Sequence, residues 1–150
     1  MISSITIRNF ECHENLTINF NKGLNFIVGN TSSGKSAIVN AIHWALLNKP
    51  TGAEYIRRKN DKIAGDCSVK ITFNDGQWVE RYRGEKINKY VINGKDYYNS
   101  VNIPEDYKKL VNINVLNYGP NEKVNFNFRF QHEPLFMLSY KSSSRADIID

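Results

Sequence analysis

The sequence predicts a mixed α/β fold (α+β-like) in which an antiparallel β-meander accompanies a buried core strand, a glycine-rich loop and a helix. Three observations predict it. Apolar and polar residues alternate over several short segments, which is the period of half-buried strands. A continuous apolar run at residues 24–28 leads into a stretch rich in glycine and serine. Directly behind that stretch, apolar residues recur with the spacing of one helix face.

The composition is that of one globular domain. The chain has 150 residues, of which 41% are hydrophobic and 12% aromatic. This is enough to bury a core and too apolar for a disordered chain. We therefore expect a single domain over residues 1–150. The sequence contains no run of about 18 apolar residues and no signal segment, which predicts a cytoplasmic protein without a membrane partner.

Two strands are expected at the start of the chain. Ile5 and Ile7 alternate with polar neighbours, and the alternation returns over residues 16–21. Residues 24–28 then have the pattern of a buried core strand that these two antiparallel strands feed. A helix should follow the glycine-rich loop, with one apolar face formed by Ile38, Ala41, Ile42, Ala45 and Leu46. A proline and a glycine within residues 50–52 end it.

Period-two alternation resumes from residue 66 and predicts the meander. Its strands are expected at residues 69–73, 78–83, 87–92 and 95–98. Asn-Asp-Gly and Asn-Gly sequences between them are typical of hairpin turns. Beyond the meander we expect a short helix at 104–111, a strand at 124–130, a loop or short apolar segment at 134–139 and a capping box at 144–147. A helix that has only just begun at residue 150 indicates the N-terminal piece of a longer protein.

The loop at residues 29–36 has the pattern Gly-x-x-x-x-Gly-Lys-Ser, which chance would produce in roughly 0.5% of chains of this length. Backbone N–H groups can turn inward around a phosphate because the glycines lack a Cβ. Lys35 offers an ammonium to the β- and γ-phosphates, and Ser36 offers a hydroxyl to Mg²⁺. The helix behind the loop directs its positive end at the anion. The predicted phosphate site consists of Gly29, Asn30, Thr31, Ser32, Ser33, Gly34, Lys35, Ser36 and Ala37.

Cysteine and histidine usage gives no sign of a metal centre. Cys12 and Cys67 are too few for a disulfide framework, and the three histidines stand far apart in the sequence. We expect reduced thiols and no structural zinc. The formal net charge of +5 is compatible with a polyanionic partner.

With these motifs the chain resembles the N-terminal half of the ABC-type ATPase heads of SMC, SbcC and RecN-like DNA-repair proteins, especially the bacterial and phage members. The matching stretches are residues 5–10 with His13, then 24–47, 55–58, 90–94 and 130–138. The resemblance implies the N-lobe of a P-loop NTPase head that continues into a coiled coil. It also implies the cofactors ATP and Mg²⁺. Gln131 is then the residue that touches Mg²⁺ and the water near the γ-phosphate.

The sequence departs from the family pattern at two places. Glu11 stands where many relatives carry a basic residue, so a phosphate contact from that position is not expected. Thr31 and Ser32 replace the Asn-Gly of many relatives, which leaves the backbone role of the loop intact.

Two parts of a complete ATPase are missing from these residues. No carboxylate follows about four apolar residues, and there is no Leu-Ser-Gly-Gly segment. The resemblance implies that both lie in a C-terminal lobe of the same head. We therefore expect residues 1–150 to bind ATP and Mg²⁺ through Lys35, Ser36 and Gln131 but to hydrolyse ATP poorly alone. The resemblance further implies an ATP-bound homodimer of heads, a nuclease subunit and double-stranded DNA as partners, and a nucleoid-associated location.

A basic and aromatic set on the meander and the loop before it is a candidate DNA surface. Its members are Arg57, Arg58, Lys59, Lys70, Arg81, Arg83, Lys86, Lys89 and Lys95, among Trp78, Tyr82 and Tyr90. Two other functions stay open. A small P-loop kinase would need a parallel βαβ series, and a nucleotide-gated interaction module would bind ATP without catalysis of its own.

Overall fold

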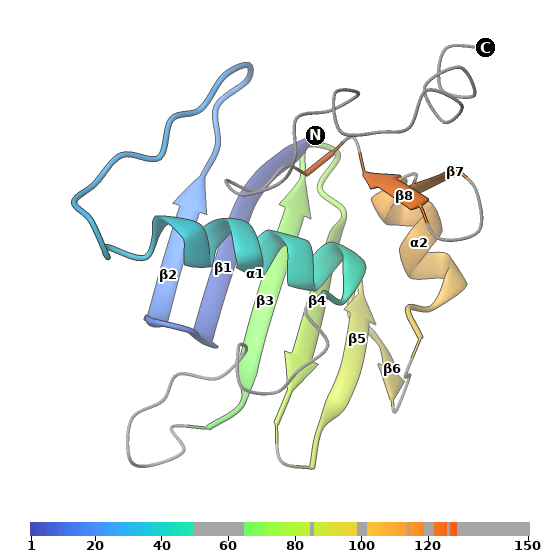
Figure 1. Ribbon diagram of the computed structural model, residues 1–150. Coiled ribbons are helices and arrows are strands. Elements are labelled where there is room, and N and C mark those ends of the chain that lie inside the picture. Colours follow the sequence, from blue (N-terminus) through green and yellow to red (C-terminus); the bar gives the residue numbers. More distant parts are fainter. Residues whose placement is uncertain are drawn as a thin grey trace. The chain divides into compact units, whose positions relative to one another are not determined.

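The computed structural model describes residues 1–49, 65–84, 86–98, 102–113, 115–118, 122–125 and 127–128 (Figure 1). The chain divides into two compact units, Met1–Val111 and Asn112–Asp150. The single domain expected over residues 1–150 therefore stays a prediction.

The described residues of the first unit form six strands and two helices. The strands are β1 (Ile2–Phe10), β2 (His13–Asn19), β3 (Cys67–Phe73), β4 (Trp78–Arg83), β5 (Asn88–Ile92) and β6 (Lys95–Tyr98), and the helices are α1 (Lys35–Leu47) and α2 (Glu105–Val111). The second unit contains a two-stranded antiparallel hairpin of β7 (Val115–Tyr118) and β8 (Glu122–Asn125). The first two strands, the four-stranded meander and both of these helices confirm the sequence prediction.

All six strands of the first unit form one sheet in the order β2-β1-β3-β4-β5-β6. Every neighbouring pair is antiparallel. Helix α1 lies across one face of this sheet (Figure 1). Short hairpin turns make β1–β2, β3–β4, β4–β5 and β5–β6 antiparallel. The pair β1–β3 is joined instead by the long segment that contains β2 and α1.

The core lies between α1 and the sheet. Ile5 and Ile7 of β1 are fully buried, and their cross-strand partners on β3 are the equally buried Ile71 and Val69. From the helix, Trp44 is fully buried, and its ring centroid lies 5.5 Å from that of Phe10, also fully buried, at the end of β1. Burial of these large apolar groups holds the helix behind the glycine-rich loop in place on the sheet.

The C-terminal end of α1 is fixed by a backbone cap and by α2. Asn48 adopts a left-handed conformation with φ 53° and donates its backbone N–H to the Trp44 carbonyl at 2.9 Å. Tyr107 of α2 is fully buried and donates its hydroxyl to the Ala45 carbonyl at 2.6 Å. The helix thus ends at Leu47, three residues before Pro50, because the left-handed backbone of Asn48 cannot continue it.

The predicted core strand at residues 24–28 is not formed in the described structure. No strand pairs with this segment among the described residues, and Leu24, Phe26 and Val28 are 80%, 78% and 87% exposed. The prediction was wrong here because a run of apolar residues becomes a buried strand only where other strands flank it. The apolar run instead lies on the surface just before the loop.

Several predictions concern residues outside the described ranges. These are Arg57, Arg58, Lys59, Gln131, the loop or short apolar segment at 134–139 and the capping box at 144–147. The strand expected at 124–130 overlaps β8 at its first two residues only.

Candidate nucleotide site

The glycine-rich loop leads directly into α1. Gly34 is the N-cap of the helix and adopts φ 86°, which a glycine reaches without strain. Ser32 also has a positive φ, of 62°, and the Ser33 N–H donates to the Asn30 carbonyl at 3.2 Å. The loop is therefore a tight turn that ends at a helix N-terminus, the arrangement typical of a phosphate-binding loop.

The first turn of α1 is available to an anion. No side chain caps Gly34, and no acidic residue lies in the first turn of α1. The leading N–H groups of a helix have no acceptor within it, and the helix dipole favours negative charge at this end. Ser36 is exposed at the second helical position, whereas Ala37 faces the core.

Lys35 folds back over the loop. Its ammonium donates to the Gly29 carbonyl at 2.9 Å and to the Asn30 carbonyl at 2.6 Å. The positive charge therefore lies across the loop, next to the helix N-terminus. A third and longer contact, of 3.5 Å, reaches Ser33 Oγ. All three ammonium donors therefore face the loop, and a phosphate contact would replace one of them.

The connection between β1 and β2 packs against the phosphate loop. A Cβ built on Gly34 would lie 2.5 Å from Cys12 Sγ and 2.7 Å from the His13 ring. His13 Nε2 lies 3.0 Å from the Gly34 carbonyl oxygen. Asn40 of α1 donates its side-chain amide to Glu11 Oε1 at 2.9 Å. Glu11 thus contacts the helix rather than the phosphate loop. This agrees with the expectation that Glu11, which stands where many relatives carry a basic residue, does not contact a phosphate.

Sequence reasoning did not assign these contacts. The sequence marks His13 only through its match to the family, and it gives no sign of a role for Asn40. The contacts join residues 21 and 29 positions apart, and no local pattern links such positions. In the sequence, only the glycine at position 34 could have indicated such packing, because another segment can approach the backbone closely only at a residue without a Cβ.

The described residues supply little of a metal site by themselves. No group of three or more His, Cys, Asp or Glu side chains that could hold a metal ion is found in the described ranges. Cys12 is exposed, Cys67 is buried, and both are free thiols. The exposed Ser36 hydroxyl is the loop oxygen predicted as a ligand, and a single protein oxygen suits Mg²⁺ held largely by nucleotide phosphates and water. The predicted second ligand, Gln131, lies outside the described residues.

The candidate DNA set divides between the two faces of the sheet. Arg81 and Tyr90 are paired across β4 and β5 on the face toward α1, where they are 1% and 0% exposed. Both assignments to a DNA surface are therefore wrong. Cross-strand register puts the side chains of Lys70, Trp78, Tyr82 and Lys89 on the opposite face, and those of Arg83 and Lys95 on the face of α1.

Arg81 is a buried cation that is held by neutral groups. Its guanidinium donates to the carbonyls of Tyr82 and Lys89 at 2.7 and 3.1 Å and to Asn88 Oδ1 at 2.6 Å. A longer contact of 3.4 Å reaches Asn48 Oδ1 at the end of α1. Desolvation by burial lowers the pKa of this guanidinium. The sequence pattern could not reveal this, since an arginine in a strand is ordinarily exposed.

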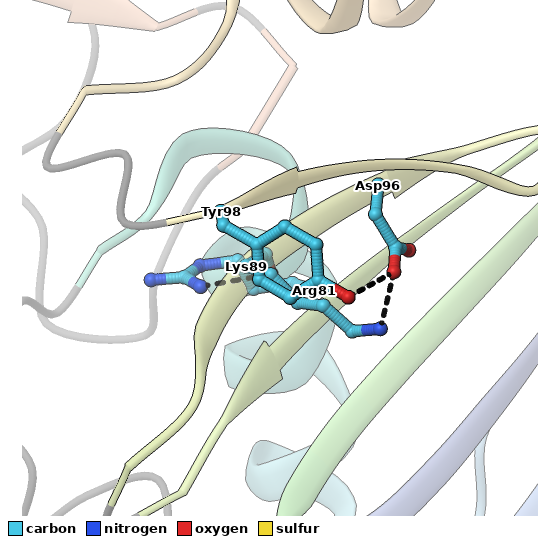
Figure 2. Close-up of polar contacts among 4 residues, drawn as sticks. All are labelled: Arg81, Lys89, Asp96 and Tyr98. Carbon is cyan, nitrogen blue, oxygen red and sulfur yellow. Dashed lines mark hydrogen bonds and ion pairs between the residues drawn. The ribbon is translucent and has the colours of Figure 1, made fainter.

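On the face opposite α1, Lys89 and Tyr98 meet at one carboxylate. Lys89 Nζ lies 2.9 Å from Asp96 Oδ2, and the Tyr98 hydroxyl donates to the same oxygen at 2.6 Å (Figure 2). The Tyr98 hydrogen bond, followed by the one from Lys89, lowers the pKa of Asp96. Lys70 lies over the Trp78 ring at 3.9 Å. This face thus combines lysines and aromatic rings, and the charge of Lys89 is offset by Asp96.

Comparisons with known proteins agree with this geometry. The chain matches the AAA domain family over residues 4–146. It is 32% identical over 119 residues to the DNA double-strand break repair Rad50 ATPase of Methanococcus maripaludis. This alignment covers 75% of this chain and 12% of that protein. It is 54% identical over 71 residues to Structural maintenance of chromosomes protein 6 of Saccharomyces cerevisiae, covering 47% of this chain and 6% of that protein.

The fold also resembles a solved structure. An SMC ATPase, described with ATP-driven dimerisation and DNA-stimulated activation, aligns with a TM-score of 0.58 at 22% identity. The alignment covers 74% of this chain and 75% of that one. In the described part of the chain, no helix combines the length and the apolar character needed to cross a membrane.

Proposed function

The chain belongs to the AAA domain family, and we propose that residues 1–150 form the ATP- and Mg²⁺-binding lobe of a Rad50- or SMC-like ATPase that acts in DNA double-strand-break repair. One observation carries the proposal. Gly34, in a left-handed conformation, caps α1, and the Lys35 ammonium lies across the loop in front of it. Backbone N–H groups, a helix dipole and a cation then converge on one position, which suits a triphosphate.

Binding of ATP tests this proposal directly. The Lys35→Ala variant should bind ATP in the presence of Mg²⁺ at least about tenfold more weakly than the wild type, because a charge-assisted contact is lost. Lys22→Ala removes a charge from an exposed position after β2 and serves as the control. Isothermal titration with both variants measures the effect. Equal affinity of Lys35→Ala and the wild type would refute the phosphate-loop assignment.

For the metal, we assign the Ser36 hydroxyl as one ligand and Gln131 as a second. Ser36 is exposed at the second position of α1, beside the proposed phosphates. Bound Mg²⁺ would neutralise charge on those phosphates. The assignment of Gln131 rests on the family resemblance, in which a glutamine ends a strand about a hundred residues after the loop.

The whole protein would complete the site with a C-terminal lobe. The chain spans 12% and 6% of the length of the two curated relatives above, and the apolar side chains of residues 24–28 are exposed. A strand of that lobe beside residues 24–28 would bury them and bring the missing carboxylate near the loop. Residues 1–150 alone would therefore hydrolyse ATP poorly, and turnover would need two complete heads around two ATP molecules.

Double-stranded DNA is the proposed macromolecular partner, with a nuclease subunit of the same assembly as a second. The Rad50 relative is a DNA double-strand break repair ATPase. Lys70 and Lys89 lie on the face opposite α1 together with Trp78 and Tyr82, and this pairing of cations with aromatic rings suits a nucleic acid. Nucleoid association would follow from DNA binding.

The two other functions have less support. A small P-loop kinase would need parallel strands joined by helices, whereas the sheet of the first unit is antiparallel throughout. A nucleotide-gated interaction module would share the loop geometry. Hydrolysis by the full-length protein separates it from the proposed ATPase, since a module without catalysis would bind ATP and leave it intact.

A further inference from the structure

His13 lies beside the phosphate loop. It is the first residue of β2 and pairs across the hairpin with Phe10. Phe10 is fully buried against Trp44 of α1. The backbone of His13 is therefore positioned by a strand that packs on the same helix that carries the loop, and its Nε2 lies 3.0 Å from the Gly34 carbonyl oxygen. Because that oxygen is an acceptor, Nε2 must carry the proton in this contact.

The Gly34 carbonyl belongs to the peptide that opens the helix. It also accepts the Ile38 N–H at 3.3 Å, a long first helical hydrogen bond. In a trans peptide the C=O and the following N–H point in opposite directions. An oxygen fixed toward His13 and the helix interior therefore directs the Lys35 N–H out of the helix N-terminus. That is where the proposed phosphate would lie.

We propose that His13 is a positioning residue for the nucleotide site. Its Nε2–H holds the Gly34–Lys35 peptide in the orientation that presents the Lys35 N–H to a phosphate. The inference rests on the proposed ATP site and adds a residue that does not itself touch the nucleotide. It also accounts for the crowding at Gly34, since the ring can reach the carbonyl only where no Cβ intervenes.

Two amide variants separate the positioning contact from the size and polarity of the side chain. In His13→Gln the amide nitrogen occupies about the position of Nε2 and can still donate to Gly34. In His13→Asn the side chain is one methylene shorter and cannot reach the carbonyl. ATP affinity in the presence of Mg²⁺ should remain near wild type in His13→Gln and fall about five- to tenfold in His13→Asn, the effect of one lost hydrogen bond. Asn15→Ala, an exposed change on the same strand, is the control.

A measurement without nucleotide tests the same contact independently. In NMR spectra of the nucleotide-free 150-residue chain, the Gly34 carbonyl carbon and the Lys35 amide nitrogen should shift in His13→Asn and return toward wild type in His13→Gln. Thermal unfolding of both variants shows whether the fold is retained.

The two proposals fail in different ways. If Lys35→Ala loses ATP affinity but His13→Asn binds ATP as the wild type does, the role of His13 is refuted and the site stands. If the wild type binds no ATP, the proposed function fails, and the NMR comparison still decides whether His13 orients the peptide. Unchanged resonances at Gly34 and Lys35 in His13→Asn would overturn the inference.

Discussion

The guanidinium of Arg81 lies 4.1 Å from the centre of the Tyr90 ring, and both side chains are buried beneath the end of α1. The Trp44 ring lies 5.3 Å from the same guanidinium, on the helix side. A cation is tolerated here because aromatic faces and backbone carbonyls replace the water that it has lost. This group joins the C-terminal end of the loop helix to the meander.

Arg81→Met should lower the free energy of unfolding by about 2–4 kcal/mol, since the carbonyls of Tyr82 and Lys89 lose their donor in a buried place. Arg81→Lys should also destabilise the fold, because one ammonium cannot reproduce the planar fork of donors. Urea denaturation measures both. Arg8→Met, at an exposed position of β1, should change the free energy by no more than about 0.5 kcal/mol. Equal stability of Arg81→Met and Arg8→Met would contradict this account.

Alkaline pH should destabilise the first unit through Tyr107. Burial raises the pKa of Tyr107, so its hydroxyl stays neutral in the fold. In the unfolded chain a tyrosine ionises near pH 10. The unfolded state then binds fewer protons, and stability is full below about pH 10 and falls above it by about 1.4 kcal/mol per pH unit for each such group. Tyr107→Phe should show a shallower loss between pH 10 and 11 in urea denaturation. An unchanged slope in that variant would argue against neutral burial.

The apolar segment before the loop should matter only in the full-length protein. Phe26 is 78% exposed in residues 1–150, so Phe26→Ser should leave the unfolding midpoint of this chain within about 1 °C. In the full-length protein the same change should destabilise the head if a strand of the C-terminal lobe covers residue 26. Differential scanning calorimetry on both lengths makes the comparison. A full-length Phe26→Ser protein as stable as its wild type would remove the support for a strand at this position.

The sequence predicted most of this fold because its signals are local. Alternation, hairpin turns and the helix face concern neighbours within a few residues. The strands and turns were confirmed between β1 and β6, and so was most of the helix face, except that Ile42 is only partly buried and Trp44 is fully buried. The prediction of a core strand at 24–28 was wrong because the burial of such a strand depends on neighbouring strands, which residues 24–28 do not specify. Arg81 and Tyr90 were misassigned because alternation gives two faces without saying which one a helix covers. The loop was identified from its glycines, whereas His13 is placed by a contact between distant residues.

On the proposed DNA face, substitutions at two neighbouring residues should change the affinity for DNA in opposite directions. Lys89 is partly neutralised by Asp96, so Asp96→Asn should raise the affinity for duplex DNA about two- to threefold at low salt, and Lys89→Ala should lower it. Lys95→Ala is the matched control, because Lys95 also lies over a tyrosine ring but on the face of α1. Fluorescence anisotropy at several salt concentrations measures all three. Binding that is insensitive to salt, or equal losses in Lys89→Ala and Lys95→Ala, would count against this face.

Two glycines with almost the same backbone separate strain from crowding in the phosphate loop. Gly34 has φ 86° and Gly23 has φ 88°, so alanine is similarly strained at both. A Cβ at Gly23 meets nothing within 4 Å, whereas one at Gly34 would lie 2.5 Å from Cys12 Sγ and 2.7 Å from the His13 ring. Gly23→Ala should therefore lower the free energy of unfolding by about 1 kcal/mol and leave ATP affinity unchanged.

Gly34→Ala carries the same backbone strain and must also displace either the β1–β2 connection or the loop. Its affinity for ATP in the presence of Mg²⁺ should fall more than about tenfold, because the loop's N–H groups lose the positions in which they converge. Titration calorimetry on the two alanine variants gives the difference in ATP affinity that crowding alone produces. If both variants bind ATP equally well, the close packing of Cys12 and His13 against the loop has no part in forming the site.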